Sequence, residues 1–146
     1  MGVRALIASV DDQGRSCIAR EAELAFEYHA GGSMGTSVVA ATETSPPPAA
    51  PPGHAGRVDL GVPPGLVRWL VVDFPPGSSA PLHHTDTIDL VFVFQGSAEL
   101  ILEDGAHPLG PGDCVMLKGV DHGWQAGPDG CRISSVVVGT PAPAAE

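Results

Sequence analysis

Two short stretches of the chain concentrate side chains that bind metals or move protons. PLHHTDTID at residues 81–89 contains His83 and Asp89, and GDCVMLKGVDHGW at 112–124 contains His122. Imidazole nitrogens with a carboxylate oxygen suit iron, manganese, nickel or zinc, and two histidines with one carboxylate form the ligand set of many non-haem iron sites. Without a metal, a histidine hydrogen-bonded to Asp89 is a general acid–base pair, because imidazole titrates near neutral pH. The residues leave both kinds of chemistry open.

Strand geometry decides which of these side chains can meet. Side chains alternate between the two faces of a strand, so an unbroken strand would project His83, Thr85 and Asp89 from one face. His84 and Asp86 would then lie on the opposite, solvated face. A bulge or register slip in this stretch would exchange the two histidines, so the alternation favours His83 as the inward one without fixing it.

The elements that carry these residues are predicted to be strands. Nineteen glycines and fifteen prolines leave few places where a helix could continue. β-branched and aromatic runs recur between turn signals about 8 to 12 residues apart, which is typical of a sandwich or small barrel. The stretch EAELAFEYHA at 21–30 could instead form a short helix, and we favour a strand because the segment is short.

The 146 residues suffice for a single domain, which we divide by composition. A strand-forming arm covers 1–44, and a proline-rich connection covers 45–64. The connection contains His54, which we expect to be solvated. A compact β core follows at 65–139, and 140–146 is the tail.

Charge and apolar pattern exclude several partners. Seventeen acidic residues against seven basic ones give a net charge of -10, which repels nucleic-acid phosphates. No apolar run is long enough to cross a bilayer, and the first residues do not resemble a signal peptide. We therefore expect a cytoplasmic protein without nucleic-acid or membrane partners.

The two chemical stretches resemble the two motifs of the cupin family. The first motif, G-x5-H-x-H-x3-4-E-x6-G, is matched by Gly77, His83, Asp89 and Gly96, with Thr85 in place of the second histidine and Asp89 in place of the glutamate. The second motif, G-x5-P-x-G-x2-H-x3-N, is matched with one residue fewer between the glycines. Its matching residues are Gly112, Gly119 and His122, with Lys118 and Ala126 in the proline and asparagine places. The resemblance covers about residues 64–139. The two motifs resemble in particular a group of small single-domain cupins often associated with bacterial and fungal secondary metabolism or small-molecule breakdown.

The resemblance implies an all-β, jelly-roll β-barrel whose cavity holds a substrate. His83, Asp89 and His122 would be the catalytic residues and the ligands of a divalent metal, which could be iron, manganese, nickel or zinc. A threonine hydroxyl is a poor ligand, so Thr85 would leave the metal with three protein ligands. We expect Thr85, Trp124, Phe92 and Trp69 to contact the substrate.

Three functions follow from the same residues. The first is a metal-dependent enzyme acting on a neutral or weakly polar small molecule, because the core has few cationic residues. The second is a metal-free lyase, dehydratase or isomerase that moves protons with the His–Asp cluster. The third is a ligand-binding cupin without catalysis. Because the arm has strands but little core of its own, and cupins are frequently dimers, we expect a homodimer.

Overall fold

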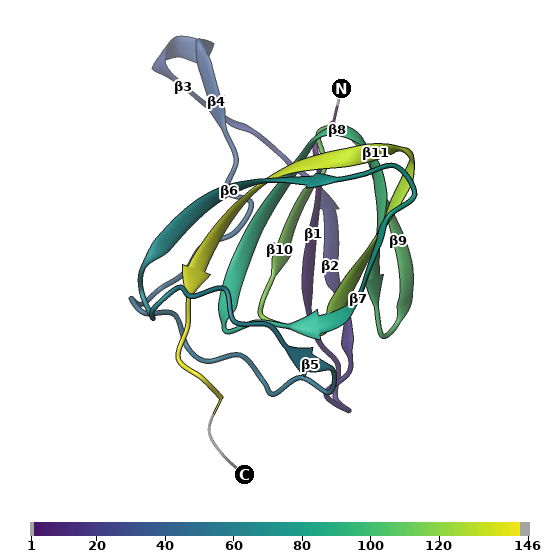
Figure 1. Cartoon of the computed structure of the whole chain (residues 1–146). Helices are drawn as coiled ribbons and strands as arrows, with labels where there is room; N and C mark the ends of the chain where they lie inside the picture. The colour runs from purple at the N-terminus through teal and green to yellow at the C-terminus, as the bar shows by residue number, and fades with distance from the viewer. Residues whose placement is uncertain (1, 144–146) are drawn as a thin grey trace.

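The structure is a computed structural model that describes residues 2–143 (Figure 1), and within them it is all-β apart from one 3-10 turn, η1 (Ala30–Gly32). The strands are β1 (Arg4–Val10), β2 (Ser16–Glu23), β3 (Glu27–His29), β4 (Met34–Thr36), β5 (Gly56–Arg57), β6 (Val67–Phe74), β7 (Ser79–His84), β8 (Thr87–Leu102), β9 (Gly105–Leu109), β10 (Cys114–Leu117) and β11 (His122–Gly139). The predicted all-β fold is confirmed. Within residues 2–143, no helix is long and apolar enough to cross a membrane.

Two long antiparallel strands, β8 and β11, organise the sheet. They pair from Gly139↔Thr87 to Gly123↔Ile101. The first part of β11 also pairs with β7, and its second part pairs with β6. The first part of β8 pairs with β10, and its end pairs with β9. The sheet order β2-β1-β10-β8-β11-β7-β5, with β6 beside β11 and β9 beside β8, therefore curls around one interior, as Figure 1 shows. This is the predicted jelly-roll architecture.

Alternation along the strands fills that interior with aliphatic side chains. Leu6 on β1, Val93 and Leu100 on β8, Leu117 on β10 and Ile133 on β11 belong to one buried cluster. Gly96, in the middle of β8, has a φ of 74° and lies so close to the carbonyl of Gly130 that a Cβ would overlap it. A glycine is required there because the two long strands come together at a bulge.

The first half of the N-terminal arm belongs to the barrel. β1 lies parallel to β10, with Ala5 opposite Cys114, and β2 pairs with β1. The free edge of β2 is held by acidic side chains from the β8–β9 turn: the N–H of Ser16 donates to Glu103 at 3.0 Å, and the N–H of Ile18 donates to Asp104 at 3.0 Å. The stretch 21–30, which we assigned to a strand, contains the end of β2 and all of β3. The β3–β4 hairpin projects from the barrel (Figure 1).

The proline-rich connection passes over one end of the barrel. Its only strand is β5, which adds to β7 in parallel, with Gly56 opposite His83. The backbone N–H of His54 and of Ala55 both donate to Asp121, just before β11. The connection is therefore fastened beside the candidate site. Of the predicted tail, residues 144–146 lie outside the described residues.

Candidate functional site

Two histidines face each other across paired strands. The antiparallel pairing of β7 and β11 places His83 opposite His122. Their ring centroids are 4.4 Å apart, with an interplanar angle of 53°. His122 is only 3% exposed, whereas His83 is half-buried. The pair thus has one ring, His122, inside the barrel and the other, His83, at its mouth.

Each imidazole is oriented by a carbonyl two residues earlier in the chain. His83 Nδ1 lies 2.9 Å from the carbonyl oxygen of Pro81, and His122 Nδ1 lies 2.8 Å from that of Val120. A carbonyl oxygen only accepts, so Nδ1 must carry the hydrogen in both rings. In the neutral rings Nε2 therefore keeps its lone pair, as ligation or proton abstraction through that atom requires.

A chain of hydroxyls ends on the carboxylate of Asp89. The hydroxyl of Thr87 donates to Asp89 Oδ1 at 2.6 Å, and Thr85 Oγ1 lies 2.8 Å from Thr87 Oγ1. All three side chains are buried. Because the single hydroxyl hydrogen of Thr87 points at Asp89, Thr85 donates to Thr87. Thr85, which we expect to contact substrate, also supports Thr87. The sequence analysis did not select Thr87, although strand alternation places it on the same face.

Burial shifts the titration of both inward groups. Burial raises the pKa of Asp89 to about 6, against the lowering effects of the Thr87 hydrogen bond and of nearby His83. Burial also lowers the pKa of His122 to about 4, although its bond to the Val120 carbonyl opposes the shift. At neutral pH, His122 is neutral and Asp89 is ionised but close to its midpoint. We call His83, Thr85, Thr87, Asp89 and His122 the interior cluster.

The predicted metal ligands are brought to the same interior but not into a close group. In the described part of the chain, one set of three His, Cys, Asp or Glu residues has ligand atoms all within 4.8 Å of one another: His54, Glu103 and Asp121. A His/Glu/Asp group that can hold a metal is thus present, at a place the sequence did not indicate. In the interior cluster the two imidazoles suit a metal, whereas the Asp89 carboxylate is bonded to Thr87.

The aromatic residues expected around the substrate divide into two places. Trp124 is buried, and its ring meets His122 edge-on with centroids 6.2 Å apart. Trp69 is 75% exposed and Phe92 is 43% exposed. Phe92 is on the opposite face of β8 from Asp89, and Trp69 Nε1 donates to Ser134 on the outer side of the sheet. We expected Trp69 and Phe92 to contact a substrate in the barrel cavity. Strand alternation instead places both side chains on the outer face of the sheet.

Comparison with known proteins agrees with the sheet and the two motifs. Residues 70–137 match the family model Cupin_2, described as a cupin domain. This segment is a cupin domain. It contains the whole interior cluster together with Glu103 and Asp121, whereas His54 precedes it.

Two curated relatives of this cupin come from the fungus Diaporthe leptostromiformis. They are the Phomopsin biosynthesis cluster proteins D and C', each 32% identical over 72 residues, which is 45% of this chain and 38% of theirs. The match thus spans well under half the length of these relatives. Among solved structures, the polyketide cyclase RemF from Streptomyces resistomycificus is 28% identical, with a TM-score of 0.45 over 49% of this chain and 53% of that one.

Proposed function

We propose that this cupin is a small-molecule enzyme that moves protons with the interior cluster. The observation that carries the proposal is the pair of facing imidazoles, each with Nδ1–H bonded to a carbonyl and Nε2 left to accept a proton. A buried carboxyl group, Asp89, lies near His83. Such a set of groups serves isomerases, dehydratases and lyases, which transfer a proton from one substrate atom to another.

The roles follow from exposure and hydrogen bonding. His83 is half-buried at the mouth, so its Nε2 is the base that reaches a substrate. His122 stays neutral and accepts a hydrogen bond from the substrate. Asp89, fixed by Thr87, stabilises the positive charge that forms on His83 when it takes a proton. Trp124 supplies an apolar wall against His122.

The charged residues of the core support a neutral or weakly polar substrate. Arg68 bonds to the carbonyl of Leu60, and Arg132 bonds to Asp73 on the outer side. Both arginines are exposed, so neither is available to grip a phosphate beside the histidines. The similarity to two proteins of a fungal biosynthesis cluster supports a role in secondary metabolism, and the expected location is cytoplasmic.

A metal-dependent enzyme is the second candidate, favoured by the same histidine tautomer. His83 and His122 would hold a divalent iron, manganese, nickel or zinc ion through Nε2, with Asp89 as the third ligand after release from Thr87. The metal would supply Lewis acidity or oxygen activation. In this case too the Pro81 and Val120 carbonyls orient the imidazoles.

Hydrogen exchange with solvent tests the proposal. Neutral carbonyl compounds with an acidic C–H are incubated in D2O with untagged protein, before and after chelation, and deuterium uptake is followed by NMR. Exchange that survives chelation supports proton transfer. Exchange that is lost, and is restored by iron, manganese, nickel or zinc, supports the second candidate. Compounds that bind without any exchange would show a non-catalytic ligand-binding cupin.

A second copy of the chain is the expected partner. The outer face of the sheet exposes Val67, Trp69 and Val71 on β6 and Phe92 and Phe94 on β8. These strands lie on either side of β11. A contiguous exposed apolar surface marks a contact site. Two copies of charge -10 repel, so they can meet at an apolar face whose charged residues, Arg132 and Asp73, pair with each other. We expect a dimer by light scattering, and Trp69→Glu should yield a monomer. A monomeric native protein would contradict this.

A further inference from the structure

A second group of titratable side chains lies on the other side of the same two strand ends. His84 and Asp121 are the chain neighbours of His83 and His122. The side chain of His84 is 14% exposed and that of Asp121 is 2% exposed. His84 Nδ1 is 3.3 Å from Asp121 Oδ1, yet neither atom has a hydrogen-bond partner. Two buried polar atoms therefore remain unsatisfied, which is costly unless another group binds them.

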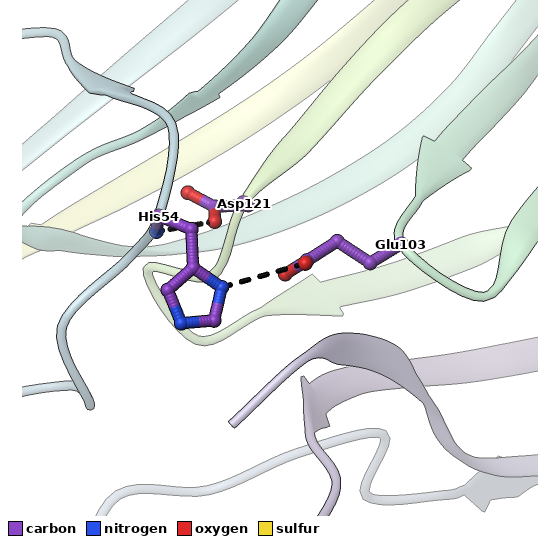
Figure 2. A group of neighbouring side chains, drawn as sticks. All are labelled: His54, Glu103 and Asp121. Atoms are coloured by element: carbon purple, nitrogen blue, oxygen red, sulfur yellow. Dashed lines mark hydrogen bonds and ion pairs between the residues drawn. The ribbon is translucent and has the colours of Figure 1, made fainter. Parts of the chain in front are cut away.

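The proline-rich connection and the β8–β9 turn complete the group. The N–H of His54 donates to Asp121 Oδ2 at 2.6 Å, and His54 Nδ1 lies 3.4 Å from Glu103 Oε2. Figure 2 shows these three side chains converging from three separate segments. Gly53 lies directly against His84 and Asp121, where a methyl group would overlap both. We call His54, His84, Glu103 and Asp121 the outer cluster.

The outer cluster has the composition of a cation site. One ligand atom each from His54, Glu103 and Asp121 lies within 4.8 Å of the others. The other oxygen of Glu103, Oε1, accepts the N–H of Ser16, which directs Oε2 toward His54. The group joins two carboxylates with an imidazole, and imidazole with carboxylate favours first-row divalent ions over magnesium.

We propose that His54, Glu103 and Asp121 bind a divalent cation of the zinc class. The bound cation links the proline-rich connection to the start of β11 and to the β8–β9 turn. Because Asp121 immediately precedes His122, the cation also holds the backbone that carries the inner imidazole. The outer cluster binds its cation whether or not the interior cluster is catalytic.

Calorimetric titration with Zn²⁺ tests the site in the full-length, untagged protein. A His83→Ala, His122→Ala variant lacks the interior imidazoles and should still bind one equivalent. Adding His54→Ala and Glu103→Gln should weaken that binding by about 10- to 100-fold or more. Glu103→Gln keeps an acceptor for Ser16, and His29→Ala, on the distant β3–β4 hairpin, is the matched histidine control.

A second measurement keeps the test decisive if the interior variant does not fold. The His54→Ala, Glu103→Gln protein should bind one Zn²⁺ fewer than the native chain. Zn²⁺ should also slow tryptic cleavage after Arg57, which lies in the fastened connection, in the native protein only. Equal stoichiometry and equal cleavage in the two proteins would overturn the proposal and leave the outer cluster as a hydrogen-bonded contact without metal.

Discussion

The interior and outer clusters are built from neighbouring residues but assembled in different ways. His83 and His122 are brought together by the pairing of β7 with β11, and each ring is oriented by a carbonyl two residues away. In the outer cluster, His54 and Glu103 reach Asp121 from segments far apart in the chain. The interior cluster is therefore fixed by strand pairing, whereas the outer cluster depends on where the proline-rich connection lies.

The largest expected effect is on catalysis, which we assign to the interior cluster and not to the outer cluster. Replacing His83 with alanine removes the base, and replacing His122 removes the acceptor beside it. We expect either change to lower the rate of deuterium exchange by about 10²- to 10⁴-fold, the range for losing a general base. His29→Ala is the control and should leave the rate unchanged. Exchange at the native rate in His83→Ala would show that the facing imidazoles are not the catalytic pair.

The next effect concerns the pH dependence of stability. Because the pKa of Asp89 is raised from 3.8 to about 6, its contribution to stability is present below pH 3.8 and is lost as the pH rises through 6. The full loss is on the order of 3 kcal/mol. His122 acts in the opposite direction, since its lowered pKa costs stability as the pH falls from 6.5 toward 4.

Asp89→Asn isolates the Asp89 contribution, because asparagine stays neutral. Urea unfolding of both proteins between pH 3.5 and 7.5, a range chosen to bracket both values, should show the variant gaining relative stability up to about pH 6 and then levelling off. A constant difference across this range would mean that Asp89 is not buried as the structure places it.

The outer cluster should show its largest effect at Asp121. Asp121→Ala removes the acceptor for the N–H groups of His54 and Ala55, which donate at 2.6 and 3.2 Å. Each lost bond to a charged group costs about 1.5 to 3 kcal/mol when the partner stays buried, and less when water replaces it. We expect a destabilisation of about 2 to 3 kcal/mol by urea unfolding. Asp121→Asn keeps an acceptor oxygen and should lose less stability than Asp121→Ala. An equal loss in the two variants would show that the charge of Asp121, rather than its hydrogen bonds, stabilises the protein.

The smallest expected effect tests the hydrogen bonds that run from Thr85 through Thr87 to Asp89. Thr87→Val removes the hydroxyl that donates to Asp89 at 2.6 Å. We expect a loss of stability of about 1 to 2 kcal/mol and a further rise in the pKa of Asp89, because the ionised form loses a donor. NMR titration of the Asp89 carboxyl carbon measures the shift. Thr87→Ser keeps the hydroxyl and should resemble the native protein; an unshifted pKa in Thr87→Val would refute the bond.

The order of residues was enough to predict the fold class and the composition of the interior cluster. Glycine, proline and β-branched runs predicted an all-β chain, and a period of two placed His83 and Asp89 on one face. These inferences depend on local geometry, which the order of residues dictates. The same period of two places Phe92 on the outer face of the sheet. We expected Phe92 to contact substrate because it is aromatic, but its side chain is 43% exposed, as the alternation requires.

The surroundings of His84, Asp86 and His54 depend on long-range packing and could not be predicted from the sequence. We expected solvated side chains at all three positions. The connection covers His84 and Asp86 pairs with Arg57, whereas the ring of His54 is exposed as expected and also lies beside Glu103. The path of a proline-rich segment is set by long-range contacts such as those of Gly53 and Asp121, which leave no periodic signal in the sequence. The burial that shifts the pKa values of Asp89 and His122 likewise arises only when the sheet curls around them.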